Sequence, residues 1–137
     1  MRAIARRVAS TGFTHRVEIR QHQLVVDEPP DTGGRDEGPH PQELMAASLA
    51  SCTAVTLEMY ARAKGWDIGP VSVECEYATP ERGQATDFKT VIRLPADCAA
   101  EQVQRLRLVA RKCNVRRVLE SEATFSERVE LSEPAVI

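Results

Sequence analysis

The stretch PQELMAASLASCTAVTLEMYARAK, residues 41–64, decides the fold, because it predicts one long helix. Proline suits the first helical position, Glu43 suits the positive end of the helix dipole, and Gly65 marks the expected end of the helix. Residues 44–57 are apolar or small on every side, so we expect this half to be buried all round. The uncharged run has 14 residues, fewer than the roughly 18 that a membrane span needs. We therefore expect a helix buried in protein and no membrane partner.

Short alternating segments surround this helix. The segments predicted as strands are 4–10, 13–20, 24–27, 71–78, 86–94 and 123–131. Residues 28–41, with four prolines and three glycines, predict a loop. Two further helices are expected over 99–112, with Asp97 as N-cap, and over 115–120 after a break at Asn114; residues 132–137 are expected to be loose. Strands and helices are segregated along the chain, which indicates an α+β fold with antiparallel sheets, in one domain over residues 1–137.

Composition argues against several function classes. Eighteen basic and 20 acidic residues give a net charge of −2, without the basic excess of a nucleic-acid binder. The N-terminus lacks the apolar run of a signal peptide, so we expect a cytoplasmic protein with reduced thiols. The four cysteines and three histidines show no metal-ligand spacing, and we expect neither a metal nor a cofactor. The question is which cysteine does chemistry.

Cys52 lies in the middle of the long helix. A free cysteine is often only a small core residue, but the small side chains one turn earlier leave room for a cavity. A mid-helix thiol gains nothing from the N-terminus of its own helix, so a reactive Cys52 requires a cation from another segment. The candidates for that cation are Arg16, Arg20 and Arg35.

The other three cysteines differ from Cys52 in position. Cys113 ends the inner face of the second predicted helix, where a thiol is well placed to attack a partner. Cys75 lies on the inward side of a strand and Cys98 lies near a helix start, and we expect both to be core contacts.

Residues 38–66, GPHPQELMAASLASCTAVTLEMYARAKGW, resemble the OsmC/Ohr family of thiol-dependent hydroperoxide reductases. In that family a Gly/Asn-x-Pro-x-Glu-Leu opening and small residues precede a cysteine. Residues 27–39 resemble the loop of the OsmC-like branch, and ARKCNVRRVL, residues 110–119, resembles the second motif, usually Cys-Pro-Val-His. The resemblance covers nearly the whole chain. It implies an OsmC-like fold with a long buried central helix in an intertwined homodimer whose sites cross the interface.

The resemblance also implies roles for the thiols. Cys52 would be the peroxidatic thiolate and Cys113 the resolving thiol of a peroxidase that reduces organic hydroperoxides with electrons from a thiol reductant. The family arginine would be Arg16 or Arg20, both in the segment THRVEIR, held by a glutamate on the helix opening. In the organic-hydroperoxide branch the position of that glutamate corresponds to Gln42 here, and Glu43 occupies the next position, as in the OsmC-like branch, which makes Glu43 the candidate for this role.

The second motif departs from the family pattern, because Asn114 and Arg116 replace its proline and histidine. Two alternatives to a peroxidase stay open. One is a non-enzymatic dimer that binds a small ligand in an apolar pocket. The other is a redox sensor in which the same disulfide changes a partner surface.

Overall fold

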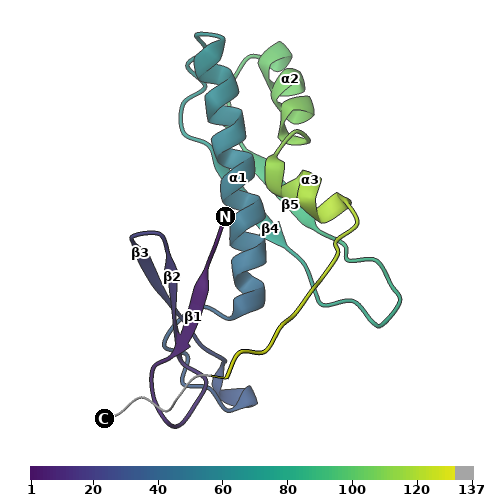
Figure 1. The fold of residues 1–137 in the computed structure, drawn as a ribbon. Helices are drawn as coiled ribbons and strands as arrows, with labels where there is room; N and C mark the ends of the chain where they lie inside the picture. The colour runs from purple at the N-terminus through teal and green to yellow at the C-terminus, as the bar shows by residue number, and fades with distance from the viewer. Residues whose placement is uncertain (132–137) are drawn as a thin grey trace.

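A computed structural model describes residues 1–131 of the chain (Figure 1). In chain order its elements are strands β1 (Ile4–Arg7), β2 (His15–Ile19) and β3 (His22–Val26), the 3-10 turn η1 (Pro30–Thr32), helix α1 (Pro41–Ala63), strands β4 (Ser72–Glu76) and β5 (Lys89–Arg93), and helices α2 (Ala100–Ala110) and α3 (Asn114–Glu120). The predicted α+β class with antiparallel sheets and one long helix is confirmed. The expectation for residues 132–137 lies outside the described residues.

Helix α1 begins and ends at local signals in the sequence. Pro41 occupies the first turn, and the backbone N–H of Gln42 donates to His40 Nδ1 at 3.2 Å. The Glu43 carboxylate returns the contact by accepting from the His40 N–H at 2.9 Å, which completes a capping box. Gly65 follows the helix with φ +67°, a left-handed conformation that glycine adopts without strain.

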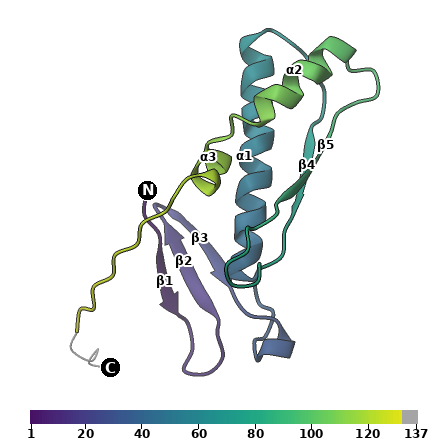
Figure 2. The same cartoon turned by 90° about the vertical axis from the view of Figure 1, so that its right-hand side faces the viewer.

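Two antiparallel sheets lie on different sides of α1 (Figures 1 and 2). Strands β1, β2 and β3 form a meander in that order. Strands β4 and β5 form a separate pair in which Val73 faces Ile92 and Cys75 faces Thr90. Because side chains alternate across a strand, these four residues share one face of the pair.

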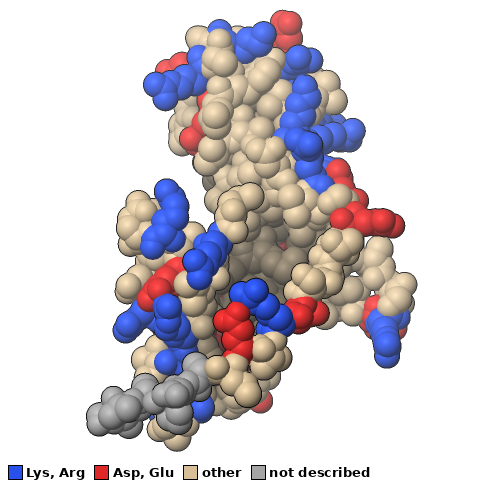
Figure 3. Space-filling view, viewed as in Figure 1, with Lys and Arg blue, Asp and Glu red and all other residues tan. Residues whose placement is uncertain are grey.

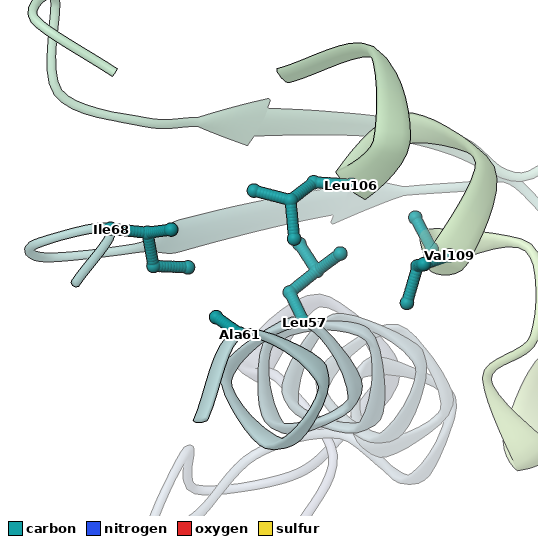
Figure 4. Packing of buried hydrophobic residues seen from close by; sticks show 6 residues of the cluster. Leu57, Ala61, Ile68, Leu106 and Val109 are labelled. Atoms are coloured by element: carbon teal, nitrogen blue, oxygen red, sulfur yellow. The ribbon is translucent and has the colours of Figure 1, made fainter. Parts of the chain in front are cut away.

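The hydrophobic core lies where α1, α2 and the β4–β5 pair meet. Figure 4 shows Leu57 and Ala61 of α1 beside Leu106 and Val109 of α2. Leu57 is fully buried, and Ile68 closes the cluster from the segment that follows α1. This packing fixes the second half of α1 against α2, and therefore also fixes where α2 ends.

A buried carboxylate organises the loop ahead of α1. Burial of Asp27, which is 1% exposed, by itself raises the pKa of its carboxyl. Hydrogen bonds from the backbone N–H groups of Glu28, Glu37 and Arg35 and from the Thr14 hydroxyl outweigh burial and bring this pKa below its usual value. The carboxylate therefore ties β3 to the loop that leads into the α1 capping box.

The expectation that residues 44–57 of α1 are buried on every side is not met within a single chain. The helix is buried along Leu49, Thr53, Leu57 and Ala61 only, and its most apolar 18-residue window, with mean hydropathy 1.3, is 22% buried. Val55 and Met59 on another face are 52% and 68% exposed. By length and composition alone α1 could also cross a membrane, but a single helix of this kind is weak evidence because core helices pass the same test.

Two local predictions are wrong. The segment 123–131 is not a strand: it runs away from α3 with Phe125 82% exposed (Figure 2), because no strand edge within the described chain pairs with it. Asp97 does not cap α2; the N-cap residue is Ala99, without a side-chain hydrogen bond. Asp97 instead lies in a turn that the Cys98 N–H closes on the Pro95 carbonyl at 3.0 Å.

Candidate active site

The α2–α3 junction brings Cys113 to Cys52. Helix α2 ends in a tight turn in which the Lys112 N–H donates to the Val109 carbonyl at 2.9 Å. Cys113 follows as the N-cap residue of α3 and is fully buried. It hydrogen-bonds through its side chain to the half-buried Cys52 in the middle of α1. Both cysteines are free, so the structure holds a dithiol rather than a disulfide.

Neutral donors surround the sulfur of Cys52. Burial by itself raises the pKa of this thiol, but hydrogen bonds from the Cys113 side chain, the backbone N–H groups of Val115 and Asn114, and the Thr56 side chain outweigh it. The pKa of Cys52 therefore lies below its ordinary value. The first N–H groups of a helix have no partner inside it, which is why the start of α3 can supply two donors. Among residues 1–131 no charged group is a cause of this lowered pKa, so neutral donors alone favour a thiolate at Cys52.

Sequence reasoning missed Asn114, Val115 and Thr56 as parts of this site. The only signal for the first two was the expected break at Asn114, since a break followed by a helix leaves free N–H groups. Thr56 follows Cys52 by one helical turn, and its hydroxyl, which has a single hydrogen, donates to the Cys52 carbonyl at 2.7 Å; it serves the Cys52 sulfur only when it turns away from that carbonyl.

The structure does not bring the three candidate arginines to Cys52 within one chain. Arg16 is exposed on β2, and Arg20 lies in the β2–β3 turn with φ +54°. Arg35 donates to the Thr11 hydroxyl at 3.3 Å. None of the three contributes to the lowered pKa of Cys52 in the described chain.

The two polar residues at the opening of α1 are engaged elsewhere. Glu43 serves the capping box, and it precedes Cys52 by nine residues, which is about 13–14 Å along the helix axis. The Gln42 carbonyl accepts from the Tyr77 hydroxyl at 2.7 Å, and its side-chain oxygen accepts from Thr79 at 3.0 Å. Both residues therefore anchor the start of the helix rather than the thiol of their own chain.

A cavity of about 630 Å³ opens between α1, α3 and the loop that joins β4 to β5, and neither Cys52 nor Cys113 is among its lining residues. Two of its lining residues, Leu49 and Thr53, lie within one turn of Cys52 on α1. The lining residues are Met45, Leu49, Thr53, Ala85, Thr86, Asp87, Phe88, Thr90, Ala110, Arg116, Leu119 and Glu120. Half of these side chains are apolar and half are polar or charged, so the cavity suits a molecule that joins an organic body to a polar group.

The two remaining cysteines lie outside this arrangement. Burial and the nearby Glu76 carboxylate raise the pKa of Cys75, which disfavours a thiolate there. Cys98 is half-buried, and its sulfur contacts Gln102 Oε1 at 3.9 Å. Within residues 1–131, no group of three or more His, Cys, Asp or Glu side chains is arranged to hold a metal ion.

Comparison with known proteins gives one family. Residues 34–128 match the family model described as OsmC-like protein, and a comparison with curated proteins finds no match. The OsmC-like protein from Mycoplasma pneumoniae is 17% identical, with a TM-score of 0.71 over 87% of this chain and 86% of the other. The organic hydroperoxide resistance protein OsmC from Legionella pneumophila is 21% identical, with a TM-score of 0.62 over 86% and 87% of the two chains.

A third solved structure, an organic hydroperoxide resistance protein from Elizabethkingia anophelis, is 19% identical, with a TM-score of 0.66 over 86% of each chain. At these identities the structural likeness shows the fold alone. The family match over residues 34–128 includes both Cys52 and Cys113.

Proposed function

We propose, from the premise that this chain belongs to the OsmC-like protein family, that it is a cytoplasmic thiol-dependent peroxidase that reduces organic hydroperoxides. One observation carries the proposal: the buried Cys113 thiol and the first N–H groups of α3 lower the pKa of the Cys52 thiol, and a cavity partly lined by apolar side chains includes Leu49 and Thr53 of the same helix turn. The organic hydroperoxide resistance proteins of the same fold support the choice of substrate class.

In the first step the Cys52 thiolate attacks one peroxide oxygen. A sulfur–oxygen bond forms while the oxygen–oxygen bond breaks, so the sulfur is oxidised by two electrons and the peroxide is reduced. The alkoxide takes a proton and leaves as an alcohol, and Cys52 becomes a sulfenic acid. The N–H groups of Asn114 and Val115 assist this step by stabilising the thiolate.

In the second step the Cys113 sulfur attacks the sulfur of the sulfenic acid. A disulfide forms, and the departing hydroxide takes the Cys113 proton and leaves as water. An external dithiol then reduces the disulfide and is itself oxidised to a disulfide, which restores both cysteines. Because Cys113 already contacts Cys52 in the reduced protein, the second step requires little movement of the backbone.

The proposal includes a homodimer. The chain exposes 11271 Å², whereas a folded monomer of its 15.2 kDa mass exposes about 7,100 Å². The surplus exceeds the roughly 1,000–2,500 Å² that each partner of an obligate dimer buries. The exposed apolar face of α1 and the unpaired segment 121–131 are the surfaces that a second copy would cover.

In the proposed dimer, Arg16 and Glu43 would also have roles at the Cys52 site. Arg16 of one copy would approach Cys52 of the other, and add a cation to its neutral donors. Nine residues at 100° each place Glu43 about 180° around α1 from Cys52. Glu43 therefore does not reach the thiol of its own helix. It would orient Arg16 only at the site that contains Cys52 of the other copy.

The test is loss of free thiols on addition of cumene hydroperoxide, followed by turnover with a dithiol. The wild-type protein should lose two thiols and consume peroxide repeatedly. Cys52→Ser should lose none to a first equivalent, and Cys113→Ser should lose one as a sulfenic acid. Cys98→Ser is the matched control and should behave as wild type.

The outcomes separate the alternatives. If excess peroxide leaves all thiols free, the peroxidase and the redox sensor are both wrong and a ligand-binding dimer stands. If the disulfide forms but no dithiol reduces it at a useful rate, a sensor replaces the peroxidase. If Cys52→Ser still consumes peroxide, Cys52 is not the peroxidatic residue.

A further inference from the structure

Helices α2 and α3 carry a net positive charge, whereas the net charge of the whole chain is negative. Between Ala100 and Glu120 there are two acidic residues, Glu101 and Glu120, and six basic ones. The basic residues are Arg105, Arg107, Arg111, Lys112, Arg116 and Arg117. Six positive and two negative charges give this segment +4, in a chain whose net charge is −2. Figure 3 shows Lys and Arg side chains gathered along α2 in the upper right of the molecule.

Three of these arginines line one groove. The groove has a volume of about 350 Å³ and lies between α2 and strand β5, and Arg107, Arg111 and Arg116 belong to its wall. The remaining lining residues are Thr90, Ile92, Leu94, Val103, Leu106 and Ala110. Thr90 and Ile92 alternate along β5 and share its α2-facing side, and Leu94 follows directly after the strand. The groove therefore combines an apolar floor with a cationic wall.

The arginines of the groove keep donors free. Within residues 1–131 neither Arg107 nor Arg111 forms an ion pair with a carboxylate, whereas Arg93 pairs with Glu74 at 2.8 Å. Arg116 uses Nε to bind Glu120 at 2.6 Å, which leaves its two terminal nitrogens outside that contact. Arg107 and Arg111 are four residues apart and so lie on the same face of α2.

We propose that this groove is a binding site for an organic anion that joins one carboxylate or phosphate group to a short apolar body. The planar guanidinium groups present paired donors that match both anions. The apolar body would cover Ile92 and Leu106 on the floor of the groove. The site rests on its own residues and requires no thiol chemistry, although it shares Thr90, Ala110 and Arg116 with the cavity between α1 and α3.

The ligand test uses the full chain with Cys52→Ser, so that its result does not depend on whether the protein is a peroxidase. Isothermal titration calorimetry compares octanoate, octyl phosphate, octanol and inorganic phosphate. We expect at least one of the two amphiphilic anions to bind about tenfold or more tightly than both octanol and inorganic phosphate. The better of the two identifies the head group. Octanol binding as tightly as both anions, or no binding by either anion, would overturn the proposal.

A pair of double variants then locates the site. Arg107→Gln with Arg111→Gln should weaken anion binding by about tenfold for each arginine removed. The matched control, Arg105→Gln with Arg117→Gln, removes the same charge. Arg105 lies about 200° around α2 from Arg107, where its Nε donates to the Tyr60 hydroxyl at 2.8 Å.

The control variant should bind the anion within about twofold of the parent protein, because its arginines lie outside the groove. Circular dichroism should show that both variants are folded. Equal losses in the two variants would mean that the anion senses only the net charge. An unchanged affinity in the Arg107/Arg111 variant would place any bound anion elsewhere. Either result overturns the assignment of the groove.

Discussion

The side chain at position 113 should set the pKa of Cys52 as well as resolve its oxidised form. Cys113→Ala removes the thiol that bonds the Cys52 sulfur and leaves the N–H groups of Asn114 and Val115 in place. Cys113→Ser also removes the resolving thiol, but it supplies a hydroxyl that donates a hydrogen bond. The two variants are therefore equal in redox chemistry and differ in one donor.

The size of the effect follows from the kind of bond that is lost. A hydrogen bond to a charged group contributes about 1.5–3 kcal/mol, and a thiol is a weak donor, which places this bond at the lower end of that range. About 1.4 kcal/mol corresponds to one pKa unit. Because the donor favours the thiolate, its removal raises the pKa. At pH values below the pKa of Cys52, its thiolate fraction should therefore fall about tenfold in Cys113→Ala and stay close to wild type in Cys113→Ser.

The assay is the rate of alkylation of Cys52 by iodoacetamide as a function of pH, followed by mass spectrometry of the peptide that contains Cys52. The curve for Cys113→Ala should lie at higher pH than the curves for the wild type and for Cys113→Ser. Because position 113 is fully buried, thermal unfolding should first confirm that both variants are folded at the temperature of the assay. Coincident curves for Cys113→Ala and Cys113→Ser would refute the reasoning, since the donor at position 113 would then have no effect on the thiolate.

Three further predictions concern the fold and the assembly. Leu57→Ala should lower the free energy of unfolding by about 2–5 kcal/mol in urea, because Leu57 is fully buried, whereas exposed Leu108→Ala should cost about 0.5 kcal/mol or less. The lowered pKa of Asp27 means that its stabilisation is complete above the ordinary pKa of about 3.9 and is lost as pH falls through the folded-state value. Asp27→Asn should therefore flatten the acid limb of stability against pH, and an unchanged limb would exclude this role. Val55→Glu, on the exposed face of α1, should convert a dimer to monomers in sedimentation velocity; a wild-type protein that sediments as a monomer would refute the dimer.

The predictable part of the fold is the part whose signals are local. Pro41 and Gly65 bracket α1 in the sequence as they do in the structure, because caps act on their own helix turn. Alternation of side chains likewise identified all five strands of residues 1–131, although four of them are shorter than predicted and β3 begins two residues earlier than predicted. The segment 123–131 alternates equally well but forms no strand, since a strand requires a paired edge and alternation along the chain does not say whether one is available.

The candidate site likewise has a part that the sequence predicts and a part that depends on the tertiary structure. Cys52 and Cys113 stand out because thiols are rare and the two motifs have characteristic surroundings. The donors at Asn114 and Val115 do not stand out, because they are backbone N–H groups that any residue would supply at the start of α3. Their effect depends on the turn at Lys112, which aims the start of α3 at α1. A search for a cation in the sequence therefore could not find the neutral groups that lower the pKa of Cys52.

At the start of α1, the side of the helix on which an acidic residue lies depends on whether it stands at position 42 or at position 43. Tyr77 and Thr79, which follow β4, donate to both oxygens of Gln42, and these contacts fix the rotation of α1 against the β4–β5 pair. With that rotation fixed, Gln42 lies about 80° around the helix from Cys52 and Glu43 about 180°. A carboxylate at position 42 would lie nearer the thiol side of its own helix, whereas Glu43 faces away and closes the capping box. The exchange of the two positions therefore separates the acidic group from the thiol within one chain, and any contact between Glu43 and a Cys52 site must cross to a second copy.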